Sequence, residues 1–241
     1  MSKIIIGNLK SYLEPTKIIE LFSQINASQN LIMAPQSVFL SSLKANFPDF
    51  NLAAQDISSI TSDYGAYTGE IGANLLKDLS IKYSIIGHSE RRQNSLDNRE
   101  TIGKKIKLAI NAGITPIICF GEDLSTRASS KYLEYLSTEL ENLLTEDLIQ
   151  SKSDFILAYE PIWSIGTGKI PTIQEIEEIA LIMSDKIKLL ENKVFLVYGG
   201  SVNSKNAKDI LQASNIDGVL VGGASTKASE LSKILEISNQ G

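Results

Sequence analysis

The chain has very little cysteine, histidine and tryptophan, with one residue of each among its 241. The single cysteine, Cys119, excludes an internal disulfide, which favours a reducing compartment such as the cytoplasm. A structural zinc site needs about four cysteine or histidine ligands, so one of each gives no basis for a metal site. The short supply of imidazole also means that any histidine chemistry must fall to His88.

Long apolar runs and an excess of positive charge are missing as well. No run approaches the roughly 18 residues that a membrane-spanning helix needs. The first residues, MSKIIIGNLKSYLEP, hold only three consecutive isoleucines before polar residues, which does not predict a signal peptide. The net charge of −5 disfavours a nucleic-acid surface. We therefore expect a cytoplasmic protein with neither a membrane nor a nucleic acid as its partner.

Eight short apolar runs recur along the chain, and a segment with helical spacing follows each of them. The runs do not alternate between apolar and polar residues, which is typical of parallel strands buried on both faces. They are predicted as strands at Lys3–Gly7, Leu31–Pro35, Leu52–Gln55, Tyr83–Gly87, Ile114–Phe120, Phe155–Glu160, Val194–Gly199 and Gly218–Gly222.

The segments between the runs carry helix signals. Pro15 opens the first, and the pairs Asp97/Glu100 and Thr172/Glu175 have the spacing of a capping box. Eight strands alternating strictly with eight helices fit either a doubly wound open sheet or a closed (βα)8 barrel. Because no linker divides the chain, the sequence favours a single-domain α/β barrel, the TIM-barrel architecture, over residues 1–241.

In such a barrel, functional residues lie at the carboxyl ends of the strands. Lys10, His88 and Glu160 follow three of the predicted strands, so closure of the barrel would place them at one mouth. Each is unremarkable alone, since a lone histidine or lysine usually lies at the surface. Two glycine-rich turns, 199–201 and 222–224, follow the last two strands, where barrels commonly bind phosphate through backbone N–H groups.

Two other features have a structural interpretation. Cys119 is expected to pack as a small apolar group. The stretch 166–169 (Gly-Thr-Gly-Lys) resembles part of a nucleotide-binding loop, but Trp163 stands where the first glycine belongs and Ile170 follows the lysine instead of serine or threonine. Nucleotide binding is therefore not supported.

Several longer motifs occur in order along the chain. They are Asn8-x-Lys10, Ala54-Gln55, Tyr67–Glu70, Ile86–Arg92 (IGHSERR), Pro116–Glu122, Ala158–Lys169 (AYEPIWSIGTGK), Tyr198–Val202 and Asp217–Ser225. Through them the chain resembles the triosephosphate isomerase family over essentially its whole length, and the segment 158–169 is the most specific. The chain departs from the family at Leu9, where tryptophan is usual, at Asp56, where asparagine is common, and at 72–74 in the third loop.

The resemblance implies interconversion of dihydroxyacetone phosphate and D-glyceraldehyde 3-phosphate through an enediolate, in glycolysis and gluconeogenesis, with no metal or cofactor. Glu160 would be the base, and desolvation should raise its pKa. His88 would be a neutral electrophile, because a helix starting at Ser89 would lower the pKa of its imidazole. The other residues implied in the site are Asn8, Lys10 and Glu90 around the substrate oxygens and Gly166, Ser201, Gly222 and Gly223 around the phosphate.

A lid and a homodimer are also implied. The lid would comprise Pro161, Ile162, Trp163, Ser164, Ile165, Gly166, Thr167, Gly168 and Lys169. The dimer would form through the loop Asp56–Glu70.

Two alternatives remain open at this stage. Another phosphate-binding barrel enzyme, such as a sugar-phosphate epimerase or an isomerase of amino-acid biosynthesis, would explain the glycine turns but not Glu160-Pro161 and the lid that follows. A barrel that has lost catalysis and serves only for binding is disfavoured, since the implied catalytic set is complete.

Overall fold

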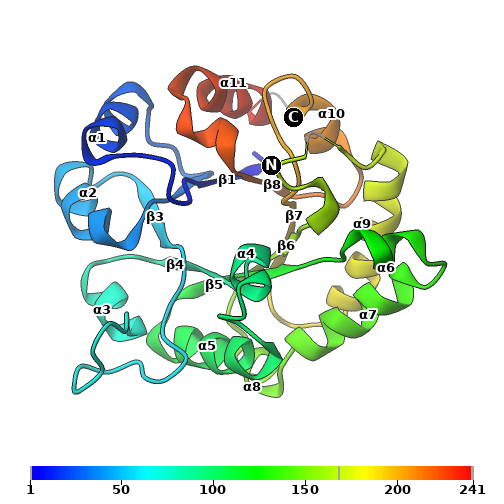
Figure 1. Cartoon of the computed structure of the whole chain (residues 1–241), viewed down its shortest axis with the longest axis horizontal. Coiled ribbons are helices and arrows are strands. Elements are labelled where there is room, and N and C mark those ends of the chain that lie inside the picture. The colour runs from blue at the N-terminus through cyan, green and yellow to red at the C-terminus, as the bar shows by residue number, and fades with distance from the viewer. Residues whose placement is uncertain (1, 168, 240–241) are drawn as a thin grey trace.

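Eight parallel strands close into a barrel in the computed structural model, which describes residues 2–167 and 169–239. β1 pairs with both β2 and β8, and this double pairing closes the sheet. In Figure 1 the helices form a ring around the strands. The strands are β1 (Ile4–Asn8), β2 (Leu31–Ala34), β3 (Asn51–Ala54), β4 (Tyr83–Ile86), β5 (Thr115–Phe120), β6 (Phe155–Tyr159), β7 (Val194–Tyr198) and β8 (Gly218–Val221).

The predicted barrel is therefore confirmed, and each predicted strand agrees with the observed one to within one residue at either end. The lack of alternation has a simple cause, because the strands are covered on both sides. Side chains such as Ile6, Ile117 and Val197 fill the barrel interior, while Ile5, Ile118 and Leu196 pack outward against the helices. Cys119 lies in the interior cluster, where it packs as a small apolar group.

The expectation of one helix after each strand is wrong for β4 and β5. Two α-helices follow β4 and three follow β5, because short polar stretches there form helical turns of their own. The α-helices in the described ranges are α1 (Pro15–Gln24), α2 (Leu40–Asn46), α3 (Ala73–Asp78), α4 (Ser89–Gln93), α5 (Arg99–Ala112), α6 (Leu124–Ala128), α7 (Tyr132–Leu143), α8 (Glu146–Ser151), α9 (Ile173–Ile187), α10 (Ala207–Gln212) and α11 (Ala228–Ser238).

The helix starts are partly as predicted. α1 begins at Pro15, and α9 has the expected capping box between Thr172 and Glu175. The box predicted from Asp97 is wrong by one residue, since Asn98 caps α5 and closes the box with Thr101. Asp97 instead turns inward, where its carboxylate lies 2.5 Å from a buried lysine of α5.

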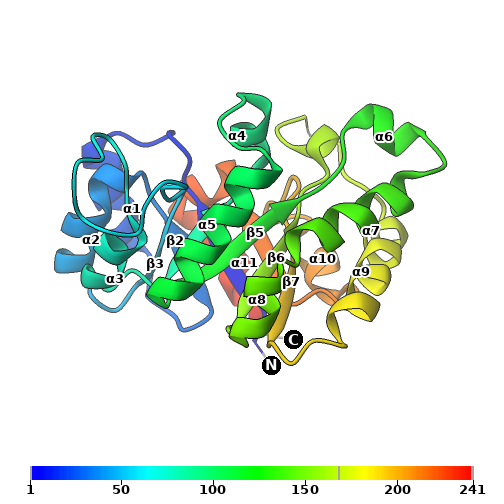
Figure 2. The same cartoon turned by 90° about the horizontal axis from the view of Figure 1, so that it is seen from below.

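The two ends of the barrel differ. In the side view of Figure 2, both chain termini lie at one end, whereas α4 and α6 rise at the other. Since α4 and α6 follow directly after β4 and β5, the second end carries the carboxyl ends of the strands. None of the described helices is long and apolar enough to cross a membrane.

Candidate active site

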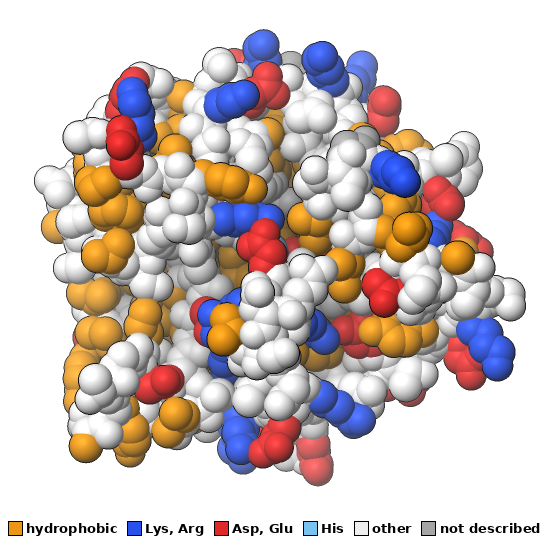
Figure 3. All heavy atoms as spheres, viewed as in Figure 1, with side chains coloured by type: hydrophobic (Ala, Val, Ile, Leu, Met, Phe, Trp, Pro, Cys, Tyr) orange, Lys and Arg blue, Asp and Glu red, His pale blue; other side chains and the backbone are white. Residues whose placement is uncertain are grey.

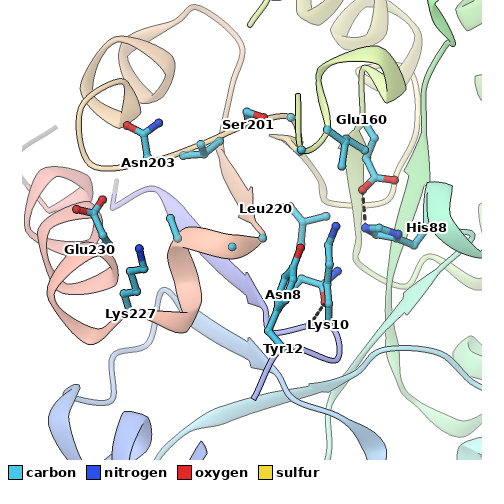
Figure 4. A pocket seen from close by; sticks show the side chains of 18 residues that line it. Asn8, Lys10, Tyr12, His88, Glu160, Ser201, Asn203, Leu220, Lys227 and Glu230 are labelled. Atoms are coloured by element: carbon cyan, nitrogen blue, oxygen red, sulfur yellow. Dashed lines mark hydrogen bonds and ion pairs between the residues drawn. The ribbon is translucent and has the colours of Figure 1, made fainter. Parts of the chain in front are cut away.

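A cavity of about 420 Å³ opens at the carboxyl ends of the strands (Figure 4). Residues from β1, β4, β6, β7 and β8 or the loops after them line it, so the closed barrel brings together segments that are far apart in the sequence. The predicted site residues that line it are Asn8, Lys10, His88, Glu160, Gly166, Ser201, Gly222 and Gly223.

Among the residues predicted around the substrate oxygens and the phosphate, Glu90 alone does not line the cavity, and it contacts Lys10 instead. The ammonium Nζ of Lys10 lies 2.5 Å from Oε1 of Glu90. The Lys10 backbone has φ +45°, a left-handed conformation that costs a non-glycine residue about 1 kcal/mol or more. Two hydrogen bonds fix it, because the Lys10 N–H donates to the side chain of Asn8 (3.0 Å) and the Gln55 amide donates to the Lys10 carbonyl (2.8 Å).

His88 is the N-cap residue of α4, so a helix begins at Ser89 as predicted. Gly87 before it has φ +71°, which lets the chain turn sharply out of β4. The backbone N–H of Glu90 donates to Nδ1 of the imidazole at 3.2 Å. In this arrangement Nδ1 carries no proton, and the neutral ring has its proton on Nε2, which faces the cavity.

Glu160 is buried at the end of β6 and is held by two neighbours. Its Oε2 accepts the backbone N–H of Ser89 at 3.0 Å, and its Oε1 lies 3.0 Å from Nε2 of His88 (Figure 4). The neighbouring strand end must be glycine, since a Cβ on Gly121 would lie 1.7 Å from the Glu160 carbonyl oxygen. The carboxylate and the imidazole are therefore in direct contact in this state.

This contact reverses both pKa directions expected from the sequence. Burial raises the pKa of Glu160, but the His88 imidazole, the Ser89 amide and the Lys10 ammonium outweigh it, and the pKa lies below its usual value. Burial lowers the pKa of His88, and the Glu160 carboxylate more than offsets this, so that pKa lies above its usual value. No sequence pattern indicates that the two groups are in contact.

The segment 161–169, predicted as a lid, borders the cavity through two of its residues. Ile165 and Gly166 line the cavity, and Gly168 lies outside the described residues. The indole N–H of Trp163 donates to Oε1 of Glu122 at 2.9 Å. After β7, the Ser201 hydroxyl donates to the carbonyl of Ser164 at 2.7 Å. Two adjacent residues of the segment, Trp163 and Ser164, are thus hydrogen-bonded to residues that follow β5 and β7.

Three supporting residues were not predicted to have a role. Gln55 fixes Lys10, the Ser89 amide fixes Glu160, and the buried Glu122 carboxylate accepts hydrogen bonds from Trp163 and from the Tyr159 hydroxyl. Gln55 directly follows β3 and Glu122 stands two residues after β5, which is the signal that identified the catalytic candidates. The remaining polar residues at the cavity, Tyr12, Asn203, Lys227 and Glu230, lie in loops or at helix ends, where the sequence carried no such signal.

The comparisons with known proteins agree with the fold and the motifs. The family model described as triosephosphate isomerase matches residues 3–238. A triosephosphate isomerase from Orientia tsutsugamushi (strain Ikeda) is 40% identical over 248 residues, which cover 98% of each chain. One from Francisella tularensis subsp. novicida (strain U112) is 37% identical over 251 residues, covering all of this chain and 98% of that protein. The chain belongs to the triosephosphate isomerase family.

Proposed function

We propose how this chain carries out the reaction of its family, the interconversion of dihydroxyacetone phosphate and D-glyceraldehyde 3-phosphate in glycolysis and gluconeogenesis. The observation that supports the proposal most strongly is the convergence of Glu160, His88 and Lys10 from three separate strand ends on one cavity. The glycine-rich turns 199–201 and 222–224 line the same cavity. A base, a hydrogen-bond donor, a cation and a phosphate cradle are the parts that this isomerisation needs.

Glu160 acts as the base. Its carboxylate takes the proton from the hydroxymethyl carbon of dihydroxyacetone phosphate, and the electron pair left behind forms an enediolate. Proton exchange between the two oxygens follows, and Glu160 returns its proton to the neighbouring carbon, which yields the aldehyde. The sum of these steps moves hydrogen within the substrate and leaves the enzyme unchanged, so no oxidant or reductant takes part.

Glu160 has to leave its resting contacts before it can act. In the structure it is held by the Ser89 amide and by His88, and both interactions lower its pKa. Turning the carboxylate toward the substrate gives up these interactions while burial remains. The same movement therefore delivers the base and strengthens it, and closure of the lid over Glu160 would complete the desolvation.

His88 then acts as a neutral donor from Nε2 to the substrate oxygens. Removal of the Glu160 carboxylate takes away the group that raises the pKa of His88. The Glu90 amide that donates to Nδ1 stays in place and disfavours a second ring proton. Lys10, whose ammonium is largely buried, balances the negative charge that develops on the oxygens.

Backbone N–H groups hold the substrate phosphate. Gly166, Ser201, Gly222 and Gly223 line the cavity, and Figure 4 shows Ser201 apart from His88. Because Gly166 belongs to the lid segment and Ser201 hydrogen-bonds that segment, binding of the phosphate and closure of the lid are coupled. Binding energy from the unreactive end of the substrate is thus used to assemble the reacting end.

A coupled assay with purified protein and D-glyceraldehyde 3-phosphate tests the reaction directly. We expect rapid isomerisation at nanomolar enzyme with no added metal or cofactor. Absence of turnover at micromolar enzyme would refute the proposed function.

We also propose that the chain forms a homodimer through the loop 56–70. Ile60 and Tyr64 in this loop are 66% and 65% exposed. Hydrophobic side chains gather along the left edge of Figure 3, on the side where Figure 1 places α2 and α3. An exposed apolar area of this kind is typical of a surface that another protein covers.

The solution mass tests the dimer. Light scattering should give twice the chain mass of 26.3 kDa. Ile60→Glu should shift the protein toward monomer, whereas Leu189→Glu, at a residue that is 81% exposed near the end of α9, should leave the mass unchanged. A monomeric wild type, or equal effects of the two changes, would contradict the proposal.

We infer a cytoplasmic location from the single cysteine, which is free and buried in the barrel interior. A protein of this composition gains nothing from an oxidising compartment. Fractionation of cells that express the chain should place it with the cytoplasmic marker proteins, and recovery with a secreted fraction would contradict the inference.

A further inference from the structure

A cluster of four charged side chains lies outside the cavity, between the end of β3 and the helices α4 and α5. At its centre is Lys105, whose side chain is 4% exposed. Its Nζ lies 2.7 and 2.8 Å from the two carboxylate oxygens of Asp56 and 2.5 Å from Oδ1 of Asp97. The guanidinium of Arg91 lies 2.7 Å from Asp56 and 3.2 Å from Asp97. The charges of the two carboxylates and the two cations thus cancel within the cluster.

Arg91 connects this cluster to His88. It belongs to α4, which has five residues and His88 as its N-cap, and its backbone N–H donates to the His88 carbonyl at 2.9 Å. A single helical turn is unstable without tertiary contacts, so its position depends on what holds its side chains. Arg92 anchors the other side of α4 through hydrogen bonds to the carbonyls of Gly87 and Cys119.

The residue before Asp56 holds the other catalytic loop. The Gln55 side chain donates to the carbonyl of Lys10 at 2.8 Å and to that of Ala34 at 2.9 Å. Two consecutive residues at the end of β3 therefore contact the two segments that carry Lys10 and His88. The turn at residues 55–56 therefore connects the segment of Lys10 to the segment of His88 and helps to set the distance between these two side chains.

We propose that Asp56 is a positioning residue for the isomerisation, and that its carboxylate, acting through Arg91, fixes α4 and thereby the orientation of the His88 imidazole. The proposal rests on the role proposed for His88. Within the described residues, the Asp56 side chain pairs with Lys105 and Arg91, and neither of these lines the cavity.

This role can be separated from stability. Burial raises the pKa of the Asp56 carboxyl, and the Asp97 carboxylate raises it further. The cations Lys105 and Arg91 lower it by less, so the pKa of Asp56 lies above its usual value. Ionised Asp56 therefore has a desolvation cost in the folded state, and an uncharged side chain of the same shape removes that cost. Lys105 keeps Asp97 as its partner in such a variant, so no buried cation is left alone.

Asp56→Asn tests the proposal, with Asp185→Asn as the matched control. The control makes the same chemical change in an exposed ion pair with Lys188, outside the cavity. Because His88 is the only histidine in the sequence, its imidazole signals in a ¹H–¹⁵N NMR spectrum are unambiguous. We expect Asp56→Asn to shift these signals and to lower kcat about five- to fifty-fold, with KM changed less than about twofold. The control should match wild type in all three measurements.

A second variant shows whether Asp56 acts through Arg91. Arg91→Gln leaves the buried lysine and both carboxylates in place, and it should give the same shift of the imidazole signals. In the double variant, Asp56→Asn should add nothing further to the loss of kcat. If Asp56→Asn folds poorly, the His88 imidazole signals of Arg91→Gln still test the proposal.

Three results would overturn the proposal: imidazole signals of Asp56→Asn or Arg91→Gln that match the control, a loss of kcat without any shift, or additive losses in the double variant. A failure of the role assigned to His88 is distinguishable, because it would show as normal turnover in a His88 variant while the spectrum of Asp56→Asn still reports on α4.

Discussion

The two sides of the cavity are built differently. On the side of the chemistry, the groups are side chains of Lys10, His88 and Glu160, and each is fixed by a contact with another polar group. On the side proposed to bind phosphate are the turns 199–201 and 222–224, whose backbone amides would hold the anion. The chemical steps depend on particular side chains. Backbone amides can bind an anion with many residue types, provided that no side chain blocks the anion from reaching them. Substitutions on the two sides should therefore fail in different ways.

The largest effect is expected on the chemical side, at the base. Glu160→Gln keeps the shape and can still accept the Ser89 amide, but it cannot take a proton from carbon. We expect kcat to fall about 10³-fold or more while the thermal unfolding temperature changes little. Activity within tenfold of wild type would remove Glu160 from the role of base. Binding of inorganic phosphate serves as the control and should be retained.

His88→Asn should be next in magnitude. Asparagine keeps a donor but is too short to reach the place of Nε2, so we expect kcat to fall about 10²-fold. Inhibition by inorganic phosphate should be nearly unchanged, since the imidazole lies on the chemical side. If phosphate binding falls as much as kcat does, His88 shapes the cavity and the comparison between the two sides breaks down.

On the phosphate side, Gly200→Ala should raise KM rather than abolish turnover. A Cβ at this position would lie 2.1 Å from the Tyr198 hydroxyl oxygen, so the turn that carries Ser201 has to move. We expect KM to rise about tenfold with kcat changed by less than about threefold. Gly103→Ala is the matched control, since its Cβ would meet only a methyl group at 3.8 Å and alanine favours its helix. A purely kcat effect of Gly200→Ala would count against a phosphate site here.

The smallest expected effect is on the pH dependence of stability. The pKa of His88 is raised, so its stabilising contribution is present below its unfolded pKa of about 6.5 and is lost as pH rises through the folded value. The pKa of Glu160 is lowered, so its contribution is present above about pH 4.5 and is lost as pH falls. Their contact should therefore stabilise the fold most between about pH 4.5 and 6.5.

Thermal unfolding of wild type and Glu160→Gln across the pH range checks this. The difference between their unfolding temperatures should be widest near pH 5.5 and should narrow above neutral pH. A difference that grows toward alkaline pH would mean that the carboxylate and the imidazole do not stabilise each other in the folded chain.

The same contrast explains what could be predicted from the sequence. Strands buried on both faces have a local signature, so their positions, and with them the strand ends that carry Lys10, His88 and Glu160, could be predicted. Contacts between strand ends are set by the closed barrel and leave no local trace. For this reason the pairing of Glu160 with His88, and both pKa directions, could not be foreseen.

Short polar segments were the least predictable part of the fold. Helices of five or six residues, such as α4 and α6, depend on tertiary anchors more than on their own sequence, and the predicted count of helices was therefore too low. The capping box of α5 was misplaced because Asp97 is of a residue type that caps helices but forms an ion pair with Lys105 instead. Lys105 also pairs with Asp56, which is forty-nine residues away in the sequence.

The pairing of β1 with β8 has a consequence for synthesis on the ribosome. Ile4 is the register partner of Gly218, so the sheet cannot close until β8 has been synthesised and can pair with β1. The cavity is divided in the same way, since Asn8 ends β1 and Lys10 follows it, while Gly222 and Gly223 follow β8. A nascent chain therefore carries no working site at any intermediate length, and activity arises only when the final strand is released and joins the first.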